Sequence, residues 1–290
     1  MSKQYRCIIC GEYLEGTEEH IIPKSLGNQS LKTWSVCKQC NSGLGTYVDN
    51  YLVNHRLIQI IRQNLGLKGQ SGQIPNPFKE GKDKNGQIIR VNDNFELTTV
   101  PKIEEENGKV RISAPTKEEA KKIALKKLKR SGLPDAEIQK VLEKIGEQES
   151  VIWQPEIEYD ATVDFNLFYL AALKIAYEYA YCKLGDKYCW KDATAERIRE
   201  VLYKSSRGDH STKYDKIMLI PSEMAACIRP ATHLNCHLLF IHPDVQNQLI
   251  VEIILFMSPA FSYSVCVSEK AFDYCEELKY NDMEIVEIQN

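Results

Sequence analysis

The sequence has no long apolar run and no excess of positive charge. Its first ten residues, MSKQYRCIIC, lack the apolar stretch of a signal peptide, and the most apolar run, residues 249–257 (LIVEIILFM), is too short to cross a bilayer and contains Glu252. We therefore expect a soluble, cytoplasmic protein with no membrane partner. The formal net charge of −3 excludes a chain that is basic throughout. Any binding of nucleic acid must then depend on local clusters of Lys and Arg.

The sequence also lacks a disulfide framework, internal repeats and low-complexity tracts. With 290 residues, 43% of them hydrophobic, the chain can form a proper core without such staples. Ten cysteines are present, and six of them are scattered without framework spacing. We expect these six to be reduced and mostly buried. They are Cys182, Cys189, Cys227, Cys236, Cys266 and Cys275.

Three segments follow one another along the chain, and together they predict an α+β fold. Residues 1–66 form a compact unit in which strand-like CIIC is followed by turn residues, then by EHIIP and WSVC, and then by a helix. That helix is expected over residues 41–65, with Gly66 as its C-terminal stop. Residues 67–115 predict a linker rich in Gly, Pro and Lys and then a small β meander. Residues 116–290 predict a larger α+β region of unknown role.

Several local signals define the elements of the later segments. Asn107-Gly108 predicts a type I′ hairpin turn. Thr116, with Glu119 three residues on, forms a capping box that opens a helix. Residues 164–185 predict a long, largely buried helix capped by its first residue, Asp164. The apolar stretches KIMLIP, CHLLFIH, LIVEIILFM and SYSVCVS predict a largely buried sheet near the carboxyl end.

Two Cys-x-x-Cys pairs lie close together near the amino terminus. They are Cys7 with Cys10, and Cys37 with Cys40. Each pair lets two thiolates converge on one ion, and four thiolates complete the tetrahedral coordination of a structural zinc, with no position open to a substrate. We expect Zn²⁺ here, in a structural role. The alternative is four unrelated buried cysteines. Two such pairs in one short segment favour a metal site over this alternative.

Between the two pairs lies EEHIIPKSLGN, residues 18–28, which a structural zinc site does not need. The stretch EHIIP, followed by VCKQCN and preceded by the first Cys-x-x-Cys pair, resembles the HNH endonuclease family, whose fold is the ββα-metal finger. The resemblance covers residues 1–66. It implies a small zinc-stapled ββα-metal nuclease module at the amino terminus, ahead of the larger mixed α+β region.

The resemblance also implies a role for individual residues. His20 matches the general base that takes a proton from the attacking water, a task suited to its ordinary pKa near 6.5. Glu19 and Asn41 match groups that hold one catalytic Mg²⁺ or Mn²⁺, which stabilises the phosphorane and the leaving group. Asp49, two helical turns beyond Asn41, is a further candidate ligand. The alternatives are a hydrogen-bonded structural histidine for His20, a tuning carboxylate for Glu19 and a helix cap for Asn41.

The chain departs from the family pattern at its middle asparagine. Lys32-Thr33-Trp34 stands where that asparagine is usual, and Asn28 is the nearest asparagine in the sequence. Asn41 stands where many members have histidine. His55, further along the same expected helix, is another residue that could complete a ligand set.

Basic side chains near the motif are candidates for phosphate contacts. Lys24, Lys32, Lys38 and Arg56 flank the expected site and would position a nucleic-acid backbone. The run KKIALKKLKR, residues 121–130, could also lie along phosphates, but charge runs of this kind are usually a solvated helix face.

These observations together predict a metal-dependent endonuclease that hydrolyses phosphodiester bonds of DNA, with RNA also open. By analogy with nuclease modules fused to larger regions, we expect a bacterial or phage defence effector, in which residues 67–290 select targets, regulate the module or form oligomers. Two rival classes are a non-catalytic zinc-ribbon protein that binds nucleic acid and a regulatory or scaffold protein.

Overall fold

The computed structural model describes residues 4–92, 94, 96–106, 109–143, 155–220, 222–228, 231, 233–278 and 283–290. The chain divides into two compact units. Unit 1 combines Met1–Pro75 with Thr162–Asn290, and unit 2 is Asn76–Ala161. This division differs from the three expected segments, because the amino-terminal segment packs with the carboxy-terminal half, and unit 2 is inserted between them in the sequence.

The amino-terminal part of unit 1 is a three-stranded antiparallel sheet followed by short helices. The strands are β1 (Gln4–Arg6), β2 (Tyr13–His20) and β3 (Lys32–Cys37), paired in the order β1-β2-β3. The helices are α1 (Lys38–Leu44), the π turn η2 (Gly45–Asp49), α2 (Asn50–Asn54) and α3 (Arg56–Asn64). A short 3₁₀ turn, η1 (Lys24–Leu26), lies in the connection from β2 to β3.

Two sequence predictions for this part were wrong in detail. The CIIC stretch forms a turn after β1 and is not a strand. The single helix expected over residues 41–65 begins earlier, at Lys38, and is interrupted at His55, whose φ of −61° and ψ of 137° are extended. The interruption lets the His55 side chain accept a hydrogen bond from the Leu57 backbone N–H and so cap the new helix. Gly66, with φ +69°, follows the last helix as expected.

The carboxy-terminal part of unit 1 consists of two helices and a five-stranded antiparallel sheet. The helices are α6 (Phe165–Lys191) and α7 (Ala193–Ser205), and the sheet order is β13-β10-β11-β12-β9. Its strands are β9 (Ile217–Leu219), β10 (Cys236–Pro243), β11 (Leu249–Ile254), β12 (Ser262–Ser268) and β13 (Met283–Glu287). The shorter elements are α8 (Ser222–Ile228), η4 (Leu255–Met257), η5 (Pro259–Phe261) and η6 (Ala271–Tyr274).

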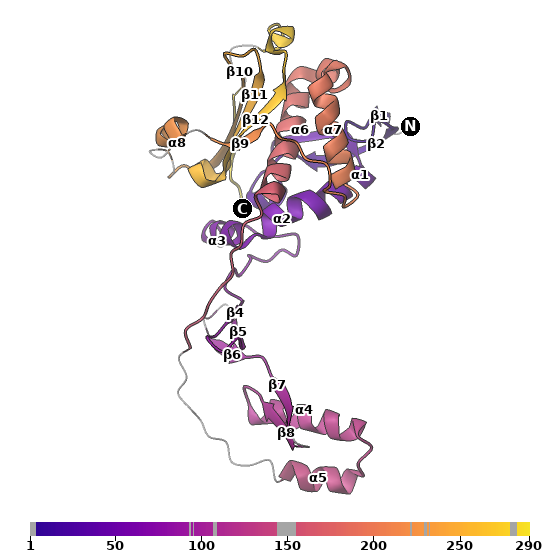
Figure 1. Ribbon diagram of the computed structural model, residues 1–290, viewed down its shortest axis with the longest axis vertical. Coiled ribbons are helices and arrows are strands. Elements are labelled where there is room, and N and C mark those ends of the chain that lie inside the picture. Colours follow the sequence, from indigo (N-terminus) through magenta and orange to yellow (C-terminus); the bar gives the residue numbers. More distant parts are fainter. Residues whose placement is uncertain are drawn as a thin grey trace. The chain divides into compact units, whose positions relative to one another are not determined.

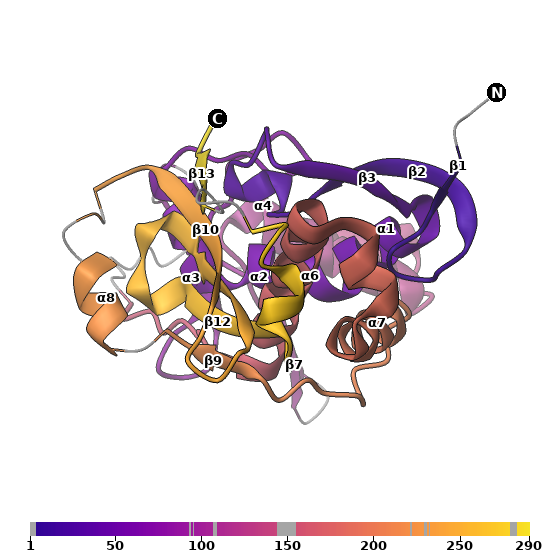
Figure 2. The ribbon, with the colours of Figure 1, turned by 90° about the horizontal axis from the view of Figure 1, so that it is seen from above.

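The long helix α6 forms the centre of unit 1. The Asp164 carboxylate caps it as predicted, by accepting hydrogen bonds from the backbone N–H groups of Asn166 and Leu167. Gly185, with φ +66°, interrupts the helix at the residue where the sequence predicted its end. The helix lies between the five-stranded sheet and the amino-terminal segment (Figures 1 and 2). Apolar side chains of all three therefore share one core.

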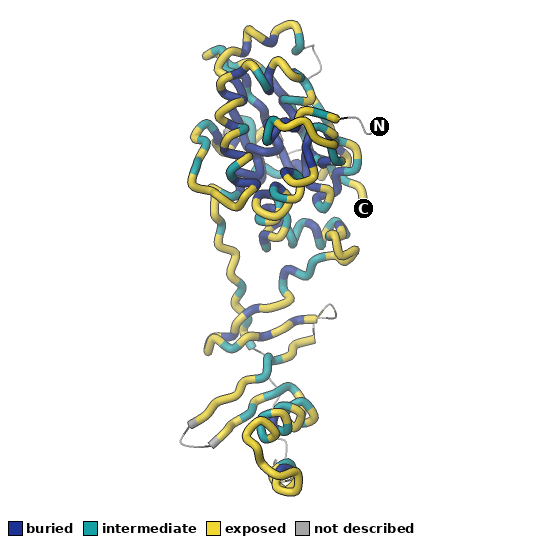
Figure 3. The backbone as a smooth tube through the Cα atoms, turned by 90° about the vertical axis from the view of Figure 1, so that its right-hand side faces the viewer, coloured by how far each residue is buried: buried dark blue, intermediate teal, exposed yellow. Residues whose placement is uncertain are grey.

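Unit 2 contains two small sheets and two helices. Its elements are β4 (Glu80–Lys82), β5 (Ile88–Val91), β6 (Leu97–Thr99), β7 (Lys102–Glu106), β8 (Lys109–Ser113), α4 (Lys117–Arg130) and α5 (Asp135–Glu143). The Thr116 side chain accepts from the Glu119 N–H, so the predicted helix start is confirmed. The turn expected at Asn107-Gly108 lies outside the described residues. Unit 2 buries few side chains, whereas unit 1 has a continuous buried interior (Figure 3).

Two further expectations can be checked against the described residues. None of the helices in that part of the chain is both long enough and apolar enough to cross a membrane. The six scattered cysteines were expected to be mostly buried, which is wrong: only Cys189 and Cys266 are buried, Cys236 is half-buried, and the others are exposed.

Candidate functional site

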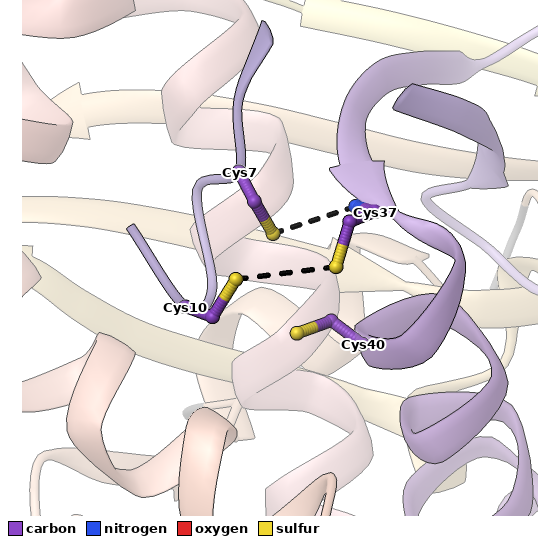
Figure 4. A group of neighbouring side chains, drawn as sticks. All are labelled: Cys7, Cys10, Cys37 and Cys40. Atoms are coloured by element: carbon purple, nitrogen blue, oxygen red, sulfur yellow. Dashed lines mark hydrogen bonds between the residues drawn. The ribbon is translucent and has the colours of Figure 1, made fainter. Parts of the chain in front are cut away.

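The four cysteines of the two pairs converge at the start of α1. Cys7 and Cys10 lie on the turn after β1, Cys37 ends β3, and Cys40 lies in the first turn of α1 (Figure 4). Their sulfur atoms all lie within 4.8 Å of one another, and Cys10 Sγ is 3.9 Å from Cys37 Sγ. A tetrahedron with metal–sulfur bonds of about 2.3 Å has sulfur–sulfur edges of about 3.8 Å. The four sulfurs therefore fit a metal ion such as zinc.

The surroundings of the sulfurs favour a cation. The backbone N–H of Cys37 donates to Cys7 Sγ at 3.4 Å, as amides do to thiolates. Hydrogen bonding from Cys40 lowers the pKa of Cys7 to about 4. Burial, together with the charge of neighbouring sulfurs, raises the pKa of Cys10 to about 11. Several thiolates cannot coexist here without an opposing charge, which a bound divalent ion would supply.

The connection from β2 to β3 is built around the fully buried Asn28. Its side-chain Nδ2 donates to the carbonyls of Ile22 (2.7 Å) and Leu31 (2.8 Å), and its Oδ1 accepts from the backbone N–H groups of Ser30 (3.2 Å) and Leu31 (2.9 Å). All four hydrogen-bonding positions of the amide are thus used. Asn28 therefore fixes the shape of the loop that follows His20.

The same loop holds the His20 ring. Nδ1 of His20 lies 3.1 Å from the Asn28 carbonyl oxygen, and Nε2 lies 3.1 Å from Oε1 of Glu18. Because a carbonyl can only accept, Nδ1 carries a proton, and in the neutral ring Nε2 is then the basic nitrogen. Burial lowers the pKa of His20 below its ordinary value, although Glu18 acts in the opposite direction. While Glu18 faces the ring, Nε2 also carries a proton and donates it to the carboxylate. When the ring loses a proton, the Asn28 carbonyl keeps the remaining one on Nδ1, so Nε2 is the nitrogen that becomes basic.

Glu19, the neighbour of His20, points into the interior. It is 4% exposed and forms an ion pair with Lys174 of α6. The same ammonium donates to Oδ2 of Asp49 at 3.0 Å and to the backbone carbonyl of His20 at 3.1 Å. Glu178, one turn further along α6, lies 3.7 Å from it. The structure therefore brings the two predicted ligands Glu19 and Asp49 together, but around a lysine.

Charges within this cluster are strongly coupled. Burial alone would lower the pKa of Lys174, but the carboxylates of Asp49, Glu178 and Glu19 outweigh it and hold the pKa well above the ordinary value. Burial raises the pKa of Glu19 and of Asp49 despite the attraction of Lys174. Glu19 and Asp49 as arranged do not fit the divalent ion that the family implies, because a permanent cation already occupies the space between them.

Asn41, inside α1, hydrogen-bonds to β2 next to Glu19. Its Nδ2 donates to Thr17 Oγ1 at 3.0 Å and to the carbonyl of Glu18 at 2.9 Å. It does not cap the helix, since Cys37 occupies that position. Asn41 thus fastens α1 to β2 immediately before Glu19 and His20. His55 is also committed elsewhere, with Nε2 3.0 Å from the carbonyl of Thr162.

Among the four basic residues expected to bind phosphate, Lys32 contacts the candidate site. Its Nζ lies 3.2 Å from Oε2 of Glu18, whose other oxygen faces His20. Lys24 and Lys38 are exposed, at η1 and at the first residue of α1, and Arg56 is half-buried at the start of α3. Lys24 and Lys32 lie in or next to the β2–β3 connection, whereas Lys38 lies at the opposite end of β3.

Three residues of this site were missed or left open by sequence reasoning. Asn28 was noted only as the nearest asparagine, and its position eight residues after His20 was the available signal. Glu18 was passed over in favour of Glu19, although alternation along β2 puts Glu18 and His20 on one face. Lys174 had no signal, because nothing in a buried helical pattern 154 residues away marks it as a partner of His20.

Comparison with known families agrees with the motif. Residues 7–57 match the family model described as HNH endonuclease. The resemblance read from the sequence is confirmed over this segment, and it supports nuclease activity on nucleic acid. The same comparisons found no curated protein and no solved structure that matches the chain.

Proposed function

We propose that the chain is an endonuclease that hydrolyses phosphodiester bonds of DNA, with His20 as its general base. The observation that carries the proposal is the His20 ring, which lies in a segment matching HNH endonucleases and is held with Nδ1 on the Asn28 carbonyl. With Nδ1 protonated, Nε2 can accept a proton from water once the Glu18 carboxylate has turned away and the ring is neutral. We also propose that the four cysteines bind zinc, which stabilises the segment and takes no part in the reaction.

Each residue around His20 has a role in this proposal. Glu18 covers Nε2 in the free protein, and its side chain is 41% exposed, so it can turn aside when substrate arrives. Lys32, at 3.2 Å from Glu18, can then exchange this carboxylate for a phosphate oxygen. Asn41 holds the Glu18 backbone in place from α1. Lys24 and Lys38 add phosphate contacts that carry no sequence information.

Cleavage of supercoiled plasmid tests the proposal. The zinc-loaded chain is incubated with DNA and Mg²⁺ or Mn²⁺, with a chelator-treated sample alongside. We expect nicking by wild type and a loss of at least about a hundredfold in His20→Ala, in keeping with the contribution of a general base. Lys68→Ala, an exposed change outside the matched segment, is the matched control. Equal nicking by wild type and His20→Ala would refute the role of His20. Cleavage assays with single-stranded DNA and with RNA then show which nucleic acid the protein prefers as substrate.

A second candidate function is supported by the buried ion pairs. Because Glu19 and Asp49 are both engaged by Lys174, the segment resembles a nuclease fold whose ligand carboxylates serve structure. A zinc-ribbon protein that binds nucleic acid without cleaving it would have this arrangement. Retention of labelled DNA with no cleavage of any substrate, by folded protein, would favour that function.

We further propose a role in bacterial or phage defence. Its support is the analogy with nuclease modules joined to larger regions. Phage plaque counts on cells that express wild type or His20→Ala test it, and equal counts would count against it.

A further inference from the structure

The Lys174 ammonium lies where three parts of the candidate site meet. It contacts Glu19 at the end of β2, Asp49 at the end of η2 and the backbone carbonyl of His20. Lys174 is fully buried, and it comes from α6, outside the segment that matches HNH endonucleases. A lysine from outside the matched segment therefore contacts three candidate site residues within it.

The hydrogen-bonding capacity of this ammonium is filled. A lysine ammonium has three N–H donors and no acceptor. Glu19 Oε1, Asp49 Oδ2 and the His20 carbonyl oxygen take one donor each. Glu178 forms an ion pair with Lys174 at 3.7 Å, which is too long for a hydrogen bond. Neither of its carboxylate oxygens has a hydrogen-bond partner among the described residues. Lys174 is thus held as a fixed cation with a defined set of three oxygen partners.

A divalent ion has different needs from this ammonium. Mg²⁺ and Mn²⁺ prefer oxygen ligands in octahedral geometry, and Mg²⁺ binds at about 2.0–2.1 Å and keeps several of its waters. Lys174 and Glu178 are 0% exposed and Glu19 is 4% exposed, so the cluster is closed to solvent on that side. Adding two positive charges next to a buried ammonium would also be strongly repulsive. The lysine and a divalent ion therefore exclude each other.

We propose that Lys174 fills the cation position between Glu19 and Asp49, so that the folded chain holds no divalent ion on these two carboxylates. Lys174 is a positioning residue: it neutralises Glu19 and Asp49 and holds the backbone of His20. A divalent ion used in cleavage would then be bound by groups other than Glu19 and Asp49, together with the phosphates of the substrate. Mg²⁺ is often bound in this way, by few protein ligands and by substrate phosphates. The inference concerns the site of the proposed nuclease, but it does not require cleavage.

Binding of Mn²⁺ to the zinc-loaded full chain tests this inference, with free Mn²⁺ measured by electron paramagnetic resonance. The first comparison is between wild type, Glu19→Gln and Asp49→Asn. We expect Mn²⁺ affinity to agree within about twofold, because neither carboxylate binds the ion. A tenfold or greater loss of affinity in either variant would overturn the proposal.

The second comparison removes the lysine. In Lys174→Met, three carboxylates lose their cation, and we expect a new Mn²⁺ site at least about tenfold tighter than any in wild type. Adding Glu19→Gln should abolish it. Lys183→Met, on the same helix but partly exposed and paired with Glu284, is the matched control and should bind as wild type does. A folded Lys174→Met that gains no Mn²⁺ site would overturn the proposal.

These readouts separate the two proposals. If no variant cleaves DNA but Mn²⁺ binding behaves as expected, the nuclease function fails and the role of Lys174 holds. If wild type cleaves and Glu19→Gln loses Mn²⁺, the role of Lys174 fails and the nuclease function holds. Should Lys174→Met not fold, the Glu19→Gln and Asp49→Asn comparison still decides the matter, since both retain the lysine.

Discussion

Unit 1 contains two buried clusters of acidic groups, which balance their charge in different ways. The cysteine cluster has four sulfurs within 4.8 Å and no basic side chain among its hydrogen-bonding partners in the described residues. The carboxylate cluster of Glu19, Asp49 and Glu178 surrounds the ammonium of Lys174. The first cluster would take its cation from solution, whereas the second has a cation covalently attached to the chain. Metal availability should therefore affect one and not the other.

The largest expected effect is the removal of metal from the cysteines. A structural zinc site of this kind contributes on the order of 10–16 kcal/mol in isolated zinc-finger peptides. We expect chelation, or Cys40→Ser, to unfold β1 to α1 and, through the shared core, to weaken all of unit 1. Hydrogen exchange with and without zinc measures it, and unit 2 serves as the internal control. Unchanged protection of β1–β3 after verified metal loss would contradict the comparison.

The next largest effect is the loss of the internal cation. Removing one partner of a buried ion pair costs about 3–5 kcal/mol, because the other charges are left uncompensated. We expect Lys174→Met to lower the free energy of unfolding of zinc-loaded protein by that amount, measured by urea denaturation. Lys183→Met is the control. A loss below about 1 kcal/mol would mean that the cluster is neutral without the lysine, and the contrast between the two clusters would disappear.

A third buried polar group responds to protons and not to metal. His237 is fully buried: its Nδ1 accepts from the Phe256 N–H, and its Nε2 lies 3.0 Å from the Leu26 carbonyl. Burial lowers its pKa to about 4. Since the unfolded chain binds this proton near pH 6.5, the stability from neutral His237 is complete above pH 6.5 and is lost as pH falls toward 4.

Between pH 7 and pH 4.5 the loss should amount to about 2 kcal/mol, from a pKa difference of roughly 2.5. Urea denaturation at pH 7 and pH 4.5, on wild type and His237→Gln, measures it. The other titrating groups are the same in both proteins, so the difference between their pH curves reports His237 alone. We expect the free energy of unfolding of the variant to fall less with acid than that of wild type. Parallel pH curves for the two proteins would exclude His237 as the source.

The smallest effect comes from an exposed ion pair, which sharpens the contrast with Lys174. Lys204 and Glu200 lie one turn apart on α7 with their charged atoms at 2.7 Å, and both side chains are exposed. Water already solvates both groups, so we expect Glu200→Gln to leave the urea midpoint within error of wild type. A clear shift of the midpoint would show that contact distance, and not burial, governs these pairs.

The sequence predicted the parts of this structure that are encoded over short distances. The two Cys-x-x-Cys pairs, the capping residues Asp164 and Thr116, and the motif around His20 all follow from neighbours along the chain. The metal-binding potential of the cysteines could be read from spacing alone, because ligand spacing on a turn fixes where two sulfurs point.

The sequence could not reveal what depends on the packing of distant segments. Lys174 lies on a helix whose neighbours are mostly apolar, and its partners are 154 and 125 residues away. The contact of His55 with Thr162, 107 residues further along the chain, was equally hidden. For the same reason, the expected boundaries at residues 66 and 115 differ from the two compact units.

The hydrogen bonds at the return of the chain into unit 1 have a practical consequence. His55 contacts the Thr162 carbonyl, and the Tyr51 hydroxyl accepts from the Asp164 N–H at 2.7 Å, so the point of re-entry is anchored next to α2. Residues 76–161, which form unit 2, lie between Pro75 and these contacts in the sequence. We expect a chain in which this segment is replaced by a Gly/Ser bridge, or by another domain, to keep unit 1 folded.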